Sequence, residues 1–143
     1  MGCLIIINII SSIIASYILY DRSDLFKLKK IPKSCSLEKF KKGILVHASF
    51  DPISSRIKRE YPNLELTVCD IYGNRHEHES AIRLSQKIFP PNSGEIKVDP
   101  TNLPFEDNSQ QIIIGITSLH EILSHEKRVE FFKEAKRILV DGG

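Results

Sequence analysis

Short apolar runs alternate with longer amphipathic segments over most of this chain, and that alternation most constrains the fold. Four runs have the length of buried strands, and each ends at acidic, small or turn-forming residues: 43–47, 64–70, 95–98 and 112–117. Helical patterns occupy 51–60, 81–88 and 124–139. Strands joined by helices through short links pair in parallel. The sequence therefore predicts an α/β domain with about four parallel strands.

The helix boundaries are marked by specific residues. Asp51 and Pro52 form a typical helix start, with Asp51 as the N-cap and Pro52 at the first helical position. Pro62 predicts the end of that helix. In the last helix, five apolar residues recur at helical spacing and predict one buried face. They are Val129, Phe132, Ala135, Ile138 and Leu139.

The first twenty residues carry no charge. From Cys3 to Tyr20, fourteen of eighteen residues are apolar, and eight of these are Ile. Eighteen helical residues extend roughly 27 Å, close to the hydrocarbon thickness of about 30 Å. Residues 1–20 are thus expected to form one transmembrane helix that anchors the chain. The alternative is an Ile-rich core helix or strand of a protein without an anchor.

Residues 21–42 form a basic linker, which has eight Lys or Arg against three Asp or Glu. The positive-inside rule places such a segment, and the domain at 43–143 that follows it, in the cytoplasm. This predicts a single-pass membrane protein with a cytoplasmic C-terminal domain. The domain itself has twelve basic against fifteen acidic residues, so no nucleic-acid partner is expected. Cys3, Cys35 and Cys69 have no metal-like spacing and are expected to be reduced thiols.

Ligands of open parallel sheets bind beyond the carboxyl ends of the strands. Here those ends carry polar segments: His47–Asp51, Asp70–Ile71, Asp99–Asn102 and Ser118–Glu121. Asp70 closes the second strand, and a carboxylate there can accept both hydrogen bonds of a ribose diol. A turn or cap role for Asp70 is the alternative. No metal site is expected, because His120 and His125 lie five residues apart and diverge by about 140° on a helix.

Three stretches in this order resemble one family. Asp99–Ser109 reads D-P-T-N-L-P-F-E-D-N-S and comes before the fourth predicted strand, Ser118–Ile122 follows that strand, and Glu134–Gly143 closes the chain. Together with the acidic end of the second strand, they resemble the N-terminal part of class I S-adenosylmethionine-dependent methyltransferases of the type 11 kind. The resemblance covers roughly residues 43–143 and implies a three-layer, Rossmann-like sheet.

The resemblance also implies a cofactor, S-adenosylmethionine, and residues that bind it. Asp70, with Ile71, would bind the ribose hydroxyls. Asp99 would accept from the adenine amino group, with Pro100 beside the ring. The loop at the methionine part would comprise His47, Ala48, Ser49 and Asp51. His120 and Glu121 are the candidate catalytic residues, as general base for a small or lipid-soluble methyl acceptor at the membrane.

Two features depart from the family pattern. Its first loop is glycine-rich, whereas residues 47–51 contain no glycine, which leaves open an interaction module that binds cofactor weakly or not at all. The chain also stops at Gly143, where the family's fifth strand would begin, so we expect a fragment of a longer protein. A dinucleotide dehydrogenase is the less favoured nucleotide hypothesis, because it depends more strictly on G-x-G-x-x-G.

Overall fold

The computed structural model describes residues 2–22, 36–49, 51, 53–72, 90 and 93–143. It divides into two compact units, Met1–Ser36 and Leu37–Gly143. The predicted helix at 81–88, most of the basic linker, Phe50 and Pro52 lie outside the described residues.

The N-terminal unit contains α1 (Gly2–Ser16), followed by the π-helical segment η1 (Tyr17–Arg22). In the part of α1 and η1 whose side chains are described, the large apolar residues are exposed, from Leu4 at 67% to Leu19 at 47%. No helix in the described segments is both long and apolar enough to cross a membrane. The transmembrane helix predicted within residues 1–20 is therefore not supported. The physical reason is length, because the 15 α-helical residues extend only about 22 Å.

In the second unit, the described residues form four parallel strands: β1 (Lys42–His47), β2 (Glu65–Asp70), β3 (Ile96–Lys97) and β4 (Ile112–Gly115). Their order in the sheet is β3-β2-β1-β4, and every pairing is parallel. The predicted α/β class and the four strands are confirmed. β4 ends earlier than predicted because the backbone turns at Thr117, whose φ is 52°.

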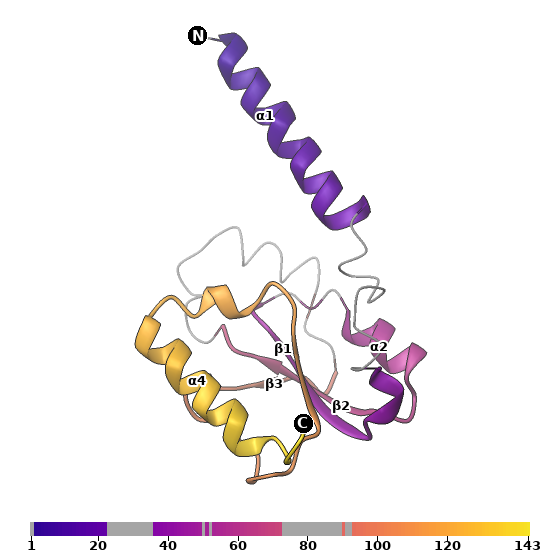
Figure 1. Ribbon diagram of the computed structural model, residues 1–143. Helices are drawn as coiled ribbons and strands as arrows, with labels where there is room; N and C mark the ends of the chain where they lie inside the picture. The colour runs from indigo at the N-terminus through magenta and orange to yellow at the C-terminus, as the bar shows by residue number, and fades with distance from the viewer. Residues whose placement is uncertain (1, 23–35, 50, 52, 73–89, 91–92) are drawn as a thin grey trace. The chain divides into compact units, whose positions relative to one another are not determined.

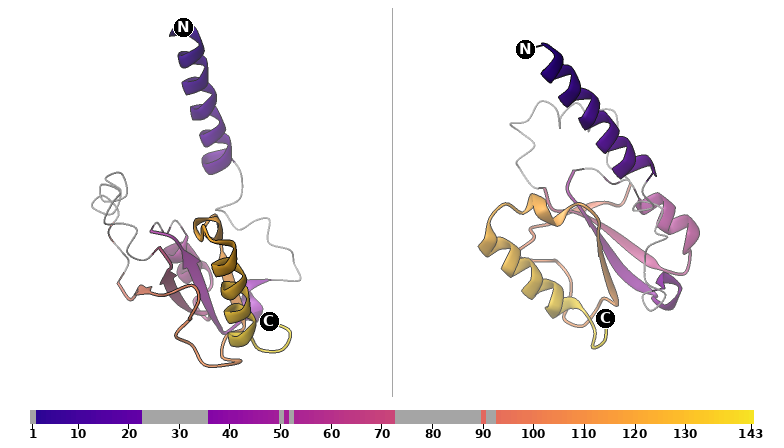
Figure 2. Two further views of the ribbon diagram at one scale, coloured as in Figure 1. Left: turned by 90° about the vertical axis from the view of Figure 1, so that its left-hand side faces the viewer. Right: turned by 45° about the horizontal axis from the view of Figure 1, so that its top comes forward.

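Two helices cover opposite faces of this sheet, α2 (Ser54–Glu60) and α4 (His125–Ile138) (Figures 1 and 2). The described residues of this unit also include two short 3-10 helices, η3 (Leu37–Lys39) and η5 (Leu119–Glu121). On β1, Ile44 and Val46 belong to the core cluster beneath α4, whereas Leu45 is buried outside that cluster. Because strand side chains alternate between faces, β1 supplies both halves of the core.

The buried face of α4 matches the prediction at Ala135 and Ile138 but differs from it in the first half of the helix. Phe131, Ala135 and Ile138 are buried, while Val129 is 40% and Phe132 59% exposed. An apolar face that includes Val129 and Phe132 and one that includes Phe131 both have helical periodicity. Periodicity alone therefore could not show which of the two is buried. Tertiary hydrogen bonds favour the second, because Arg137 donates to the carbonyls of Leu103 and Phe105 at 3.0 and 2.8 Å.

The thiol of Cys69 is fully buried in the core under α4. Burial, with a smaller contribution from the charge of Glu95, raises its pKa to about 12. The thiolate is the reactive form, so Cys69 stays protonated and inert at neutral pH.

This makes a prediction about thiol labelling. In a Cys3→Ser, Cys35→Ser double variant, we expect the remaining thiol to react with Ellman's reagent at pH 8 at least about 100-fold more slowly in the native protein than in denaturant. Absorbance at 412 nm follows the reaction. Equal rates in the two states would contradict the burial of Cys69.

Candidate functional site

The carboxyl ends of the strands lie at one edge of the sheet. β1 pairs with β2 on one side and with β4 on the other, and the helices that follow β1 and β4 cover opposite faces (Figure 2). The chain therefore reverses direction across the sheet between β1 and β4. In open α/β sheets this switch point is where ligands bind.

The loop after β1 has a turn of the kind that favours glycine, although it contains none. Ser49 lies in the left-handed region, with φ at 68°. Its N–H donates to Asp70 Oδ1 at 2.9 Å. Thr117, after the neighbouring β4, is also left-handed. Ala48 is half-buried and packs against the core.

Asp51 lies two residues before Ile53, the N-cap of α2, so its predicted position as the N-cap is wrong. The Asp51 side chain nevertheless bonds to amides at the start of the helix. Its Oδ1 accepts from the N–H groups of Ile53 and Ser54, at 3.1 and 2.8 Å. The amides of the N-cap and of the first helical residue are thus already paired with an anion from the protein itself. Asp51 therefore serves the helix, and its predicted contact with the methionine part of a cofactor would require those bonds to rearrange.

His47 faces away from solvent at the end of β1. It is 4% exposed, and its Nε2 lies 3.3 Å from Glu95 Oε2 across the sheet. Neither ring nitrogen has a well-formed hydrogen bond among the described residues. The structure thus pairs His47 with Glu95, a partner that the sequence patterns did not reveal because the two residues lie far apart in the chain.

Asp70 lies at the end of β2 and is only 3% exposed. Besides Ser49 N–H, its Oδ1 accepts the N–H of Tyr72 at 2.9 Å. Its neighbour Ile71 is 7% exposed and belongs to the core. One carboxylate oxygen therefore joins the loops that follow β1 and β2.

Asp99 is the acidic residue most open to solvent among those predicted to bind cofactor. Its Oδ1 accepts from the N–H and the hydroxyl of Thr101, at 2.8 and 2.7 Å. These two bonds hold the pKa of the Asp99 carboxyl below its ordinary value. The carboxylate is therefore ionised at neutral pH and acts only as an acceptor. Pro100, beside it, is half-buried.

His120 and Glu121 lie together in η5, after β4. His120 Nε2 is 3.0 Å from Glu121 Oε1, and the imidazole is 68% exposed. Just before them, the buried hydroxyl of Ser118 donates to the Val46 carbonyl at 2.8 Å. This bond ties the ends of β4 and β1 together, a role that the sequence analysis missed.

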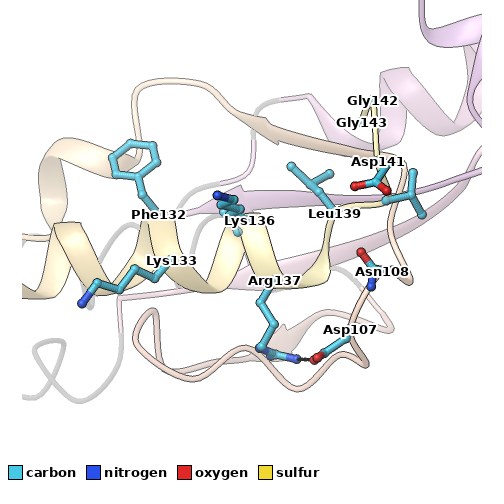
Figure 3. Close-up of a pocket in the computed structure, with 12 residues that line it drawn as sticks. Asp107, Asn108, Phe132, Lys133, Lys136, Arg137, Leu139, Asp141, Gly142 and Gly143 are labelled. Atoms are coloured by element: carbon cyan, nitrogen blue, oxygen red, sulfur yellow. Dashed lines mark hydrogen bonds and ion pairs between the residues drawn. The ribbon is translucent and has the colours of Figure 1, made fainter.

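Two charged residues of α4 bond to the Asp99–Ser109 stretch. Glu134 Oε2 accepts the Leu103 N–H at 2.9 Å. Arg137 donates to Asp107 and Glu134, both at 2.7 Å, in addition to its two carbonyl partners. Figure 3 shows Arg137 directed towards Asp107. Several residues that carry the family resemblance thus have structural roles, which spacing along the chain could not show.

A hollow of about 750 Å³ lies elsewhere, where the end of α4 meets the segment before β4 (Figure 3). Its lining includes Asn108, Phe132, Lys136 and Leu139. These residues flank the amino end of β4, whereas the predicted site residues follow the carboxyl ends of the strands. The hollow and the predicted site are therefore separate.

The left-handed Ser49 leads to a test of the loop. A non-glycine residue in this conformation costs about 1–2 kcal/mol, so we expect Ser49→Gly to raise the free energy of unfolding by about 0.5–1 kcal/mol in urea denaturation. The matched control is Ser55→Gly within α2, which should lower it by a similar amount. Destabilisation by both variants would contradict the loop geometry.

No family model matches the chain, and no curated protein matches it. A solved structure, an S-adenosylmethionine-dependent methyltransferase described as a possible histamine N-methyltransferase from Thermotoga maritima, has a TM-score of 0.48 and 17% sequence identity. The alignment covers 93% of this chain and 54% of that one. This chain thus spans about half the length of that methyltransferase.

Proposed function

We propose that the second unit binds S-adenosylmethionine at the carboxyl edge of its sheet and supports methyl transfer to a small or lipid-soluble acceptor. The observation that carries this proposal is the ionised, solvent-open carboxylate of Asp99, which follows β3 in the stretch resembling the methyltransferase family. The switch point between β1 and β4 lies at the same edge of the sheet, and ligands of open α/β sheets bind at such a point, which also supports the proposal.

The residues present fit the adenosine part of this cofactor best. Asp99 accepts hydrogen bonds only, which suits an exocyclic amine. The left-handed turn at Ser49 gives the first loop a conformation that glycine would otherwise supply. At the methionine part the fit is poorer, because Asp51 already pairs with amides at the start of α2.

The bound cofactor would supply a methyl group on a positively charged sulfur, already a good leaving group. Catalysis then depends mainly on positioning, which falls to the loops after β1, β3 and β4. Asp99 would orient the adenine ring of the cofactor. The exposed imidazole of His120 could accept a proton at a ring nitrogen from a hydroxyl or protonated amine acceptor, with Glu121 beside it to stabilise the imidazolium.

Isothermal titration of the full chain with S-adenosylmethionine tests the proposal. We expect saturable one-to-one binding with a dissociation constant between about 1 μM and 1 mM. S-adenosylhomocysteine should compete for the same site and displace S-adenosylmethionine. Heats no larger than those of dilution up to millimolar ligand would overturn the proposal.

We also propose that the N-terminal unit inserts its apolar side chains into a lipid bilayer. Support comes from the uniformly exposed apolar surface of α1 and from the eight basic residues of the segment 21–42. Lysines beside an apolar segment favour anionic, cytoplasmic lipid surfaces. The catalytic unit would then act on acceptors at that membrane face.

Vesicle flotation tests the membrane proposal. The full chain should float with vesicles of phosphatidylcholine and phosphatidylserine and stay bound after a high-salt wash. Ile9→Lys with Ile13→Lys should abolish flotation, whereas Val129→Lys in α4 should not. A wild-type chain that stays in the pellet or washes free would contradict the proposal.

A second candidate function is a methyltransferase-like interaction module that binds cofactor weakly or not at all. The bonding of Asp51 to amides at the start of α2 favours it, because those amides are not open to a ligand anion. The titration above separates the two functions.

A further inference from the structure

We infer that Asp70 serves the site as a positioning residue, which holds the glycine-free loop after β1 in its left-handed turn. This inference deepens the proposed function, since it assigns Asp70 a role different from direct contact with a ribose diol.

The hydrogen bonds of Asp70 carry the inference. Its Oδ1 accepts both Ser49 N–H and Tyr72 N–H, each at 2.9 Å. The backbone N–H of Val98 also donates to the Asp70 carbonyl at 2.9 Å. Asp70 is therefore bonded to segments that follow β1, β2 and β3. Its 3% exposure leaves little of it open to a ligand.

The need for such a tether follows from the loop sequence. Ser49 has a φ of 68°, a conformation that glycine adopts freely and other residues adopt at a cost. A carboxylate that accepts the Ser49 N–H forms a charge-assisted bond and offsets that cost. The Asp70 side chain thus stabilises a left-handed turn that a glycine would adopt without such a hydrogen bond.

The inference predicts that the effect of an Asp70 substitution on cofactor affinity depends on the residue at position 49. Asp70→Ala should lower affinity for S-adenosylmethionine by at least about 10-fold, because the loop leaves its left-handed turn. Adding Ser49→Gly should restore most of that loss, since the turn no longer requires a tether. Asp70→Asn should stay within about threefold of wild type, because its amide oxygen can still accept both N–H groups.

A direct ligand role predicts a different pattern. A ribose diol bound by both carboxylate oxygens would lose affinity in Asp70→Asn, and Ser49→Gly would not recover the affinity of Asp70→Ala. Either of those two results would overturn the inference.

Amide exchange of the ligand-free protein provides a readout independent of the cofactor. Protection of the Ser49 and Tyr72 amides, followed by NMR, should persist in Asp70→Asn and fall at least about 10-fold in Asp70→Ala, while protection of the Leu45 amide within β1 should be unchanged in both. If wild type fails to bind the cofactor, the proposed function fails, and the exchange rates still decide whether Asp70 holds the loop. Unchanged protection of Ser49 in Asp70→Ala would refute the tether.

Discussion

Replacement of Phe131 by Ala is expected to lower the free energy of unfolding by about 3–5 kcal/mol. Phe131 is 2% exposed and belongs to the core cluster formed by α4 and the sheet. Truncation removes its buried surface and leaves a cavity that the sheet beneath cannot close. Urea denaturation followed by circular dichroism measures the change.

The neighbouring Phe132 provides a matched control. It has the same side chain on the same helix but is 59% exposed, and its ring meets Phe131 edge-to-face, with 5.6 Å between centroids. Phe132→Ala should therefore cost no more than about 1 kcal/mol. The reverse order of effects would show that α4 buries the stripe predicted from the sequence instead.

Replacement of Asp99 by Ala is expected to reduce affinity for S-adenosylmethionine by about 10- to 100-fold. Loss of one charge-assisted hydrogen bond costs about 1.5–3 kcal/mol of binding free energy. Because the pKa of Asp99 is lowered, its contribution should be constant at neutral pH and decline only in acid, as the carboxylate becomes protonated. Titration calorimetry across pH measures both effects.

Two controls separate binding from folding. Asp99→Asn keeps an oxygen for the Thr101 turn and should leave the melting temperature near that of wild type while weakening binding. Asp141→Ala removes an exposed carboxylate near the end of the chain and should change neither quantity. Full affinity in Asp99→Ala would remove Asp99 from the site.

Much of the fold could be predicted because it depends on local patterns. The apolar runs at 43–47 and 64–70 correspond to β1 and β2, and Asp51 bonds to amides at the start of α2, although the N-cap itself is Ile53. In each case the signal lies within a few consecutive residues. Parallel pairing then follows from the alternation of strands and helices.

The rotation of α4 could not be predicted in the same way. Two stripes with equal periodicity compete for the core, and the choice depends on contacts between Arg137 and a segment about thirty residues earlier. The transmembrane prediction is not supported for a different reason. Hydropathy gives the extent of an apolar segment but not where its α-helix ends, and here η1 replaces the α-helix at Tyr17.

For the site, the sequence predicted which residues follow the strands but not what they bind. Asp70 and Asp99 both follow strands as expected, yet one is buried against backbone amides and the other is open to solvent. Ser49, one partner of Asp70, and Glu95, the partner of His47, lie far away in the chain, so spacing along the chain could not reveal them. Which carboxylates meet a ligand is therefore a property of tertiary structure.

The central claim is that a nucleotide cofactor binds at the carboxyl edge of the sheet. Chemical-shift mapping of the ¹⁵N-labelled chain with S-adenosylmethionine tests it most directly. The account predicts shifts confined to the amides of Ser49, Tyr72, Asp99, Thr101 and the segment 117–121. Shifts confined instead to Asn108, Lys136 and Asp141, around the hollow at the other end of the sheet, or no shifts at all, would contradict it.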